Sequence, residues 1–226
     1  KKNYKIITLD DLDNRYHYSD IIVNYDPKNL NSNNFNLKLN KKKNAKYLLG
    51  PKYCILPKIK YSKKKKKNFF SITMYLGGSG DLTLISNLLK PLLNRLKLLQ
   101  KKVKVNVIIG PLCKNKNKIY KISKKNKNII PIEKSNNLIN IYKNSDLLVA
   151  SAGSSVFEAS IVKLPSILIC LSKNQFTDVS YLEKIGHYFF LDYKNIKREL
   201  KKLSELIYLN LFFYKRFSNL LNTAQL

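Results

Sequence analysis

The sequence predicts an α/β protein built on doubly wound parallel sheets, and three observations support this. Short, wholly apolar runs recur along the chain and suit strands that are buried on both faces of a parallel sheet. From residue 68 onward these runs alternate with segments of helical periodicity, the pattern of a strand–helix–strand fold. Hydrophobic residues make up 44% and aromatic residues 11% of the 226 residues, which is enough to form a folded core.

The first sixty residues predict three short strands, and we assign residues 1–60 to the remainder of an N-terminal Rossmann-like domain. The three runs are "YKIITLDD" (4–11), "DIIVNY" (20–25) and "KYLLGPKYCIL" (46–56). Each is a short apolar run that ends in polar or turn-forming residues. The polar, Asn-rich segment at 26–44 predicts a loop.

A run of like charges marks the boundary between two domains. "KIKYSKKKKK" (58–67) is strongly basic and lies between ordered patterns, so residues 61–68 are interpreted as a basic linker. Residues 69–226 then form a second, complete Rossmann-like domain.

The second domain predicts a regular alternation of strands and helices. Its strands are expected at 68–76, 103–110, 128–132, 146–151, 165–171 and 187–192. Its helices are expected at 82–99, 137–145, 155–162, 177–186 and over most of 194–222, with a further charged helical segment after residue 110. Pro91 is expected to kink or divide the first of these helices, because proline removes a backbone donor.

The formal charge of +29 raises the alternative of a nucleic-acid-binding protein. That class predicts binding that weakens steeply with salt. The lysines are dispersed along the chain, and no recognition helix, aromatic RNA platform or zinc motif accompanies them, so nucleic acid is disfavoured as a partner.

Cysteine content and hydropathy restrict the remaining classes. Cys54, Cys113 and Cys170 are odd in number and lack metal-like spacing, so neither a disulfide framework nor a metal site is expected. No apolar run reaches the ~18 residues of a membrane span, and the start does not resemble a signal peptide. A cytoplasmic location is therefore expected. The first residue is Lys rather than Met, which suggests a missing upstream portion.

Two turns of small residues are the candidate binding elements. "GGSGD" (77–81) and "SAGSS" (151–155) each follow a predicted strand and lead into a predicted helix. Ligands of such sheets bind beyond the carboxyl ends of the strands, and the first N–H groups of a helix are unpaired. Both turns therefore suit the close approach of a diphosphate. Neither has the spacing of a known phosphate loop, and two plain glycine turns remain an alternative.

Glu158 lies in the first turn of the helix that follows the second turn. It could form a capping box with Ser155, three residues earlier. It could equally accept hydrogen bonds from ribose hydroxyls, with a diphosphate at the same helix start. The local pattern leaves both roles open.

"SAGSSVFEASIVKLPSILICLSKNQ" (151–175) resembles the nucleotide-binding motif of the UDP-2,4-diacetamido-2,4,6-trideoxy-β-L-altropyranose hydrolases of pseudaminic acid biosynthesis, which are relatives of the GT-B glycosyltransferases. Three further stretches are similar to family motifs in the same order. They are "ITLDDLDNRYHYSDIIVNYD", "YLLGPKYCILPKI" and "MYLGGSGDL".

The resemblance implies a GT-B-like fold in which a UDP-linked amino sugar is hydrolysed by an activated water. It assigns the ribose to Glu158, the uracil to the strand around Ile132, and the sugar or phosphate side of the cleft to Asn174 and Gln175. It assigns the diphosphate to the two turns of small residues, at Gly77, Gly78, Ser79, Gly153, Ser154 and Ser155. It implies no nicotinamide, flavin or metal cofactor.

The chain departs from the family at the catalytic position. The family's histidine belongs to a Gly-x-Gly-His loop that this sequence lacks, so it is expected upstream of Lys1 in a missing N-terminal half. His17 matches a different motif, and His187 begins a strand. A GT-B glycosyltransferase that passes the sugar to an acceptor is the alternative enzyme.

Two smaller departures from the family pattern affect the motifs themselves. Gly80 stands where the family often has Asp, with Asp81 one place later, which alters the register of the first turn. Lys163 replaces the Gly of the family's Gly-x-Pro, while Pro165 is retained.

Overall fold

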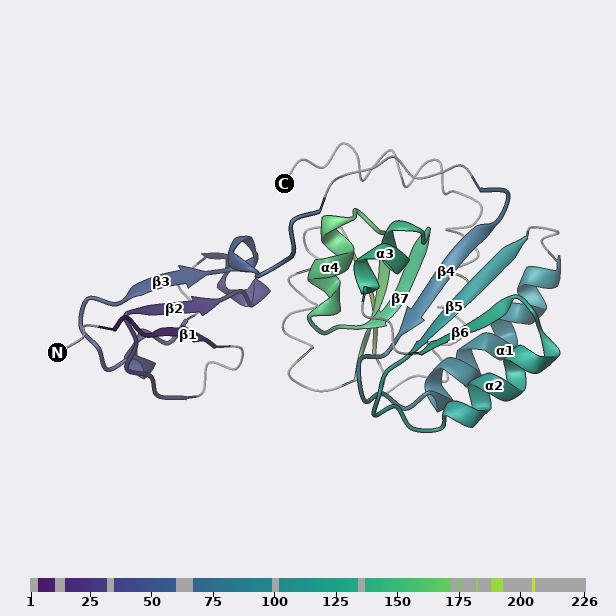
Figure 1. Ribbon diagram of the computed structural model, residues 1–226, viewed down its shortest axis with the longest axis horizontal. Helices are drawn as coiled ribbons and strands as arrows, with labels where there is room; N and C mark the ends of the chain where they lie inside the picture. Colours follow the sequence, from purple (N-terminus) through teal and green to yellow (C-terminus); the bar gives the residue numbers. More distant parts are fainter. Residues whose placement is uncertain are drawn as a thin grey trace.

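The computed structural model describes residues 4–10, 15–31, 35–59, 67–98, 102–133, 137–171 and 188–192, with Gln175, Leu182 and Glu205. These residues form two lobes, each built on a parallel sheet (Figure 1). The predicted α/β class with parallel sheets is confirmed. The expected helices at 177–186 and 194–222 lie outside the described residues, as does most of the expected linker.

The N-terminal lobe contains a three-stranded parallel sheet in the order β1-β2-β3. The strands are β1 (Ile7–Leu9), β2 (Ile21–Asn24) and β3 (Lys46–Leu49). The segment expected as a loop contains two 3-10 helices, η1 (Pro27–Asn31) and η2 (Leu37–Leu39), and a third, η3 (Pro51–Tyr53), ends the run after β3. Phe35, beside η2, packs its ring 5.8 Å from that of Tyr47 and so covers one face of the sheet.

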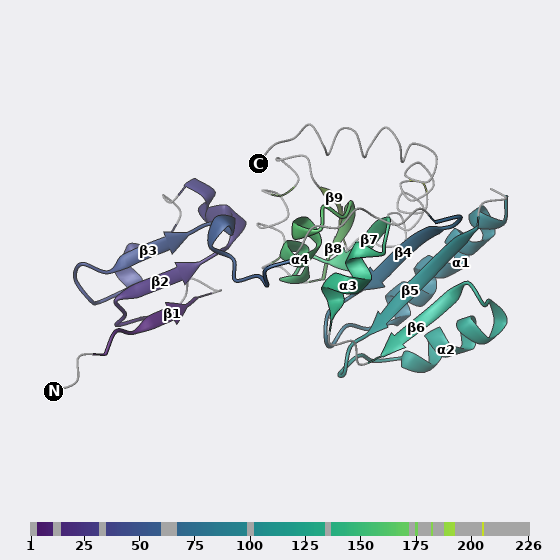
Figure 2. The ribbon, with the colours of Figure 1, turned by 45° about the horizontal axis from the view of Figure 1, so that its top comes forward.

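The C-terminal lobe contains a six-stranded parallel sheet in the order β6-β5-β4-β7-β8-β9 (Figure 2). Its strands are β4 (Phe70–Tyr75), β5 (Val103–Ile109), β6 (Ile129–Glu133), β7 (Leu147–Ser151), β8 (Ser166–Cys170) and β9 (Tyr188–Asp192). Its helices are α1 (Thr83–Leu98), α2 (Lys116–Lys125), α3 (Leu138–Lys143) and α4 (Ser155–Ile161). Every strand predicted in this domain is present.

The strand order reverses between β4 and β7. The chain passes from β4 outward through β5 to β6, then returns to β7 and continues outward on the other side. Because β4 and β7 are parallel neighbours, their carboxyl ends lie side by side. A reversal of this kind leaves a crevice at the carboxyl edge of the sheet, which is where open α/β sheets bind ligands.

Helices cover both faces of the large sheet. One apolar cluster joins strand residues such as Ile72 and Val149 to leucines of α1, while a second joins Leu148 and Ala150 to α3 and α4. Alternate residues of β7 therefore point into different clusters, as expected of a strand buried on both faces.

Helix α1 continues through Pro91, so the predicted division does not occur. Its buried face carries Leu88, Leu89 and Leu92, each no more than 3% exposed. Burying three such side chains is worth about 1.5–3 kcal/mol each. That exceeds the roughly 3 kcal/mol cost of an internal proline. Packing against the sheet thus outweighs the local penalty.

Polar groups fix the register between β4 and β7. The Asp146 carboxylate accepts a hydrogen bond from the Ser71 amide at 2.9 Å, and the Asp146 amide donates to the Ser71 carbonyl at 2.8 Å. The buried hydroxyls of Thr73 and Ser145 lie 2.6 Å apart. Lys67 Nζ approaches Asp146 Oδ2 at 3.3 Å, so the first described residue after the gap at 60–66 is tied to the same corner.

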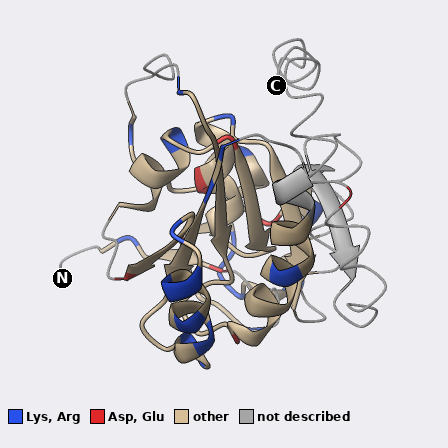
Figure 3. Ribbon diagram, turned by 90° about the vertical axis from the view of Figure 1, so that its right-hand side faces the viewer, with Lys and Arg blue, Asp and Glu red and all other residues tan. Residues whose placement is uncertain are grey.

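Basic residues are distributed over several helices and loops of the described chain (Figure 3). Some lie over aromatic rings, with Lys104 Nζ 4.4 Å from the centre of the Phe69 ring and Lys41 Nζ 4.8 Å from that of Tyr16. The expectation that nucleic acid is not a partner stays a prediction. Within the described ranges, no helix is both long enough and apolar enough to cross a bilayer.

Truncating Leu148 tests the importance of the second cluster. Leu148 is fully buried in β7, so Leu148→Ala should lower the free energy of unfolding by about 2–5 kcal/mol through lost burial and a cavity. Leu112→Ala is the matched control because that side chain is 74% exposed, and it should change stability by less than about 0.5 kcal/mol. Urea unfolding measures both, and equal effects would contradict the assigned core.

Candidate functional site

The turns after β4 and β7 meet at the point where the strand order reverses. Gly77 has φ +84°, a conformation that favours glycine, and a Cβ atom added to it would lie 3.7 Å from Ser151 Oγ. A Cβ atom added to Gly78 or Gly153 would meet no heavy atom within 4 Å. The backbone of both turns is therefore open to a ligand on at least one side.

Gly110 holds the first turn in place, and the sequence reasoning did not identify it. A Cβ atom at this position would lie 2.5 Å from the Gly78 carbonyl oxygen and 2.6 Å from Gly78 Cα. The amide of Leu112 donates to that same carbonyl oxygen at 2.9 Å. In the sequence, Gly110 could have been identified because it is followed by Pro111 at the carboxyl end of a predicted strand.

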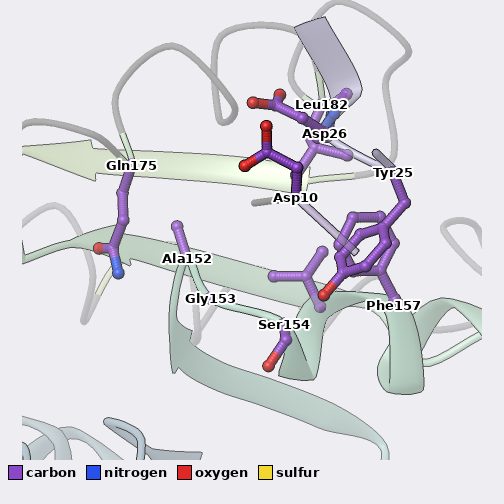
Figure 4. A pocket seen from close by; sticks show the side chains of 11 residues that line it. Asp10, Tyr25, Asp26, Ala152, Gly153, Ser154, Phe157, Gln175 and Leu182 are labelled. Carbon is purple, nitrogen blue, oxygen red and sulfur yellow. The ribbon is translucent and has the colours of Figure 1, made fainter. Parts of the chain in front are cut away.

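An inter-lobe pocket of about 310 Å³ lies beside the second turn (Figure 4). Asp10, Tyr25 and Asp26 line it from the N-terminal lobe. The opposite wall includes Gly153, Ser154 and Gln175. The Tyr25 and Phe157 rings meet edge to face at 5.5 Å and join the two lobes at the border of this pocket.

A second cavity, which we call the loop pocket, has a volume of about 510 Å³ and lies beside the first turn. Its lining includes Ser79, Gly80, Asn87 and Ser151. Gln175 lines both pockets, and its Oε1 accepts a hydrogen bond from the Leu171 amide at 2.9 Å. The two pockets thus form neighbouring parts of one region at the carboxyl edge of the sheet.

Asp10 is the most firmly held group of the N-terminal wall. Its Oδ2 lies 2.9 Å from His17 Nε2 and its Oδ1 lies 3.5 Å from an Arg15 guanidinium nitrogen. Its amide donates to the carbonyl of Val23 at 3.0 Å, which continues the pairing of β1 with β2. Neither Asp10 nor Asp26 was among the predicted site residues, although both follow the carboxyl end of a predicted strand.

The capping-box role of Glu158 is wrong in this structure. Helix α4 begins one residue earlier than a capping box would need, with Ser154 as its N-cap and no side-chain capping bond. Glu158 is therefore the fourth helical residue rather than the third.

Glu158 instead faces a partly buried group of side chains away from the two pockets. Burial raises the pKa of the Glu158 carboxyl, and among the described residues its buried Oε2 has no hydrogen-bond partner. Burial also raises the pKa of Cys54, Tyr75 and Tyr142, and the charge of Glu158 adds to the shift in each case. The carboxylate is thus an unused acceptor close to the end of β4.

The structure brings together only part of the predicted set. Ser79, Gly153, Ser154 and Gln175 line the two pockets, while Gly77 and Gly78 form the turn beside them. The others lie elsewhere: Ser155 is buried in α4, Glu158 faces the group around Tyr142, and Ile132 is half-buried in β6, two strands from β4. Asn174 and His187 lie outside the described residues. His17 pairs with Asp10.

A doubly wound parallel sheet with pockets at its strand-order reversal places this lobe among the Rossmann-like α/β domains. Residues 72–217 match the glycosyltransferase family 28 C-terminal domain, which is more than half of the chain. The chain belongs to this family. Comparison with curated proteins gives no match.

Solved structures share the fold at low sequence identity. MurG of Acinetobacter baumannii aligns with a TM-score of 0.54 at 13% identity, over 84% of this chain and 52% of that one. The pneumococcal O-GlcNAc transferase GtfA, solved in complex with UDP and GlcNAc, aligns with a TM-score of 0.55 at 12% identity, over 88% and 39%. The chain thus spans about half or less of the length of these proteins, and the predicted GT-B-like fold is confirmed.

The pKa of Glu158 leads to a test by pH. A carboxyl whose folded-state pKa is raised destabilises the fold once it ionises, and the penalty disappears below its unfolded value of about 4.5. Glu158→Gln should therefore raise the urea midpoint at pH 7, and the gain should fade as the pH drops through the folded pKa towards 4.5. Unfolding curves across this range provide the measurement. A gain that does not change with pH would show that burial of the charge is not the cause.

Proposed function

We propose that this chain binds a UDP-linked sugar at the carboxyl edge of its large sheet and belongs to an enzyme that transfers the sugar to an acceptor hydroxyl. The observation that carries the proposal is the convergence of the two small-residue turns with two adjoining pockets at the strand-order reversal. Membership of glycosyltransferase family 28 supports the nucleotide-sugar class. The similar fold of a transferase solved with UDP and GlcNAc is consistent with it.

Under this proposal the diphosphate lies against the turn at Gly77, Gly78 and Ser79 and the turn at Gly153 and Ser154, with Ser155 at the helix start. Backbone amides and hydroxyls would donate to its oxygens, and glycine lets the backbone come close. Gln175 would keep its amide N–H groups for the ligand because its Oε1 is already used by Leu171. The sequence resemblance assigns Asn174 to the same sugar or phosphate side of the ligand.

The nucleoside would lie against the far side of α4. The sequence resemblance assigns the ribose to Glu158, whose carboxylate oxygens could accept from the two O–H donors of a ribose diol. The uracil would rest on the backbone near Ile132. No nicotinamide, flavin or metal is needed for this chemistry.

Transfer breaks the bond between the anomeric carbon and the phosphate oxygen, and UDP leaves with the electron pair. A new bond forms between that carbon and the acceptor oxygen, whose proton must pass to a base. The chain spans about half or less of the length of the similar solved structures, so the complete reaction is proposed for a whole enzyme and not for this chain alone.

Hydrolysis is the second candidate, favoured by the four motifs that resemble the UDP-2,4-diacetamido-2,4,6-trideoxy-β-L-altropyranose hydrolases of pseudaminic acid biosynthesis. In that reaction water replaces the acceptor hydroxyl. Incubating a complete enzyme with the UDP-sugar in the absence of acceptor separates the two. Stoichiometric release of free sugar would favour the hydrolase, whereas a strict dependence on added acceptor would favour the transferase.

Calorimetric titration with UDP tests the site. Gly153→Val should weaken UDP binding at least about tenfold, because a side chain at this position enters open space beside the turn without touching the protein. Ser160→Val is the matched control, since it places a similar side chain on the exposed face of α4, the helix that follows this turn. Parent-like affinity in Gly153→Val, or no UDP binding by the parent chain, would refute the proposal.

A further inference from the structure

We infer that residues 110–115, which we call the backing segment, position the first turn: they bind its carbonyl oxygens and thereby aim its amide N–H groups at the diphosphate. The inference rests on the proposed function and adds the part of the protein that orients the backbone donors. The backing segment follows β5 and leads into α2. The loop pocket is lined by Ser79, Gly80 and Asp81 but by no residue of 110–115, so the pocket and the backing segment contact different sides of the turn.

Two carbonyl oxygens at the start of the turn face the backing segment. The Gly77 oxygen lies 3.5 Å from Cys113 Sγ, and the Leu112 amide donates to the Gly78 oxygen at 2.9 Å. In a planar trans peptide, the C=O of one residue and the N–H of the next point in opposite directions. The N–H groups of Gly78 and Ser79 therefore point away from the backing segment.

These two N–H groups are open to a ligand. Neither the Gly78 amide nor the Ser79 amide donates a hydrogen bond to any acceptor among the described residues. A Cβ atom added to Gly78 would meet no heavy atom within 4 Å, so a phosphate oxygen can approach this backbone. Successive backbone N–H groups that point the same way attract an anion, and donors that are already oriented lose little entropy when it binds.

The other end of the turn is attached to the same segment. The Lys114 amide donates to the Gly80 oxygen at 3.2 Å, and the Lys114 oxygen accepts from the Leu82 amide at 3.1 Å. Asn115 Nδ2 donates to Asp81 Oδ1 at 2.8 Å, which fixes the carboxylate that follows the glycines. The backing segment thus holds the turn at both ends and leaves its middle to the ligand.

Gly110 sets the distance between the backing segment and the turn. A Cβ atom at this position would lie 2.5 Å from the Gly78 oxygen and 2.7 Å from the Gly77 oxygen, which is closer than real Cβ atoms come. Gly110 is not among the glycines with positive φ, so alanine would not meet the strain of the left-handed region here. The added methyl group would therefore act by displacing the turn.

The experiment compares UDP with uridine, which lacks the diphosphate. Gly110→Ala should weaken UDP binding at least about tenfold, because displaced amides no longer donate to the phosphate oxygens, while uridine affinity stays within about twofold. Calorimetry measures UDP binding, and ligand-observed NMR measures the weaker binding of uridine. Asn117→Ala is the matched control, since Asn117 is exposed in α2 beyond the backing segment, and it should leave both affinities within about twofold.

The outcomes separate the two proposals. If the parent does not bind UDP, the proposed function fails and this inference fails with it. A role of Gly110 in stability alone would lower both affinities together. If the parent binds UDP and Gly110→Ala keeps the parent's ratio of UDP to uridine affinity, only this inference is overturned.

Asn115→Gly decides alone should Gly110→Ala fail to fold by circular dichroism. Glycine suits the φ of +61° at this position, so the change removes the hydrogen bond to Asp81 without straining the backbone. Loss of this bond to a charged group should lower the ratio of UDP to uridine affinity at least about threefold. An unchanged ratio would overturn the inference.

Discussion

The parallel pairing of β4 with β7 is the interaction on which the candidate site depends. Met74 is opposite Val149 and Tyr75 is opposite Ala150, so the two strands end together and their turns meet. The hydrogen bonds between Asp146 and Ser71 fix this register at the other end of the same strand pair. A slip of one residue would turn every side chain of β7 to the opposite face and separate the turns.

Small residues give this site its space. Gly110 lets β5 and its following turn approach the Gly78 backbone to a distance that no side chain would permit, and Gly153 leaves the second turn bare. The hydroxyls of Ser79, Ser151 and Ser154 then supply polar groups without filling the pockets. Glycine thus leaves space and serine supplies polar groups. Because the turns need only be small and adjacent, they do not require the spacing of a known phosphate loop.

The fold was predictable from the sequence wherever the signal was local. Apolar runs marked every strand of the large sheet, including the edge strand β6. Pro91 misled because its local penalty is smaller than the burial of Leu88, Leu89 and Leu92, which depends on tertiary packing. The two turns were found from composition, whereas Gly110, Asp10 and Asp26 were not. Their importance comes from a neighbour that is distant in sequence, such as Gly78 for Gly110 and the Gly153 turn for the two carboxylates.

Acidic side chains lie at two separate places near the cleft, although the chain as a whole is strongly basic. Glu158 lies on one flank of α4, where burial disfavours its ionised form, and Asp10 and Asp26 line the pocket on another. The small-residue turns carry no charged side chain from Gly77 to Gly80 or from Ser151 to Ser155. Under the proposed function, a nucleoside diphosphate sugar would place its diphosphate against these uncharged turns and its two uncharged ends on either side of them.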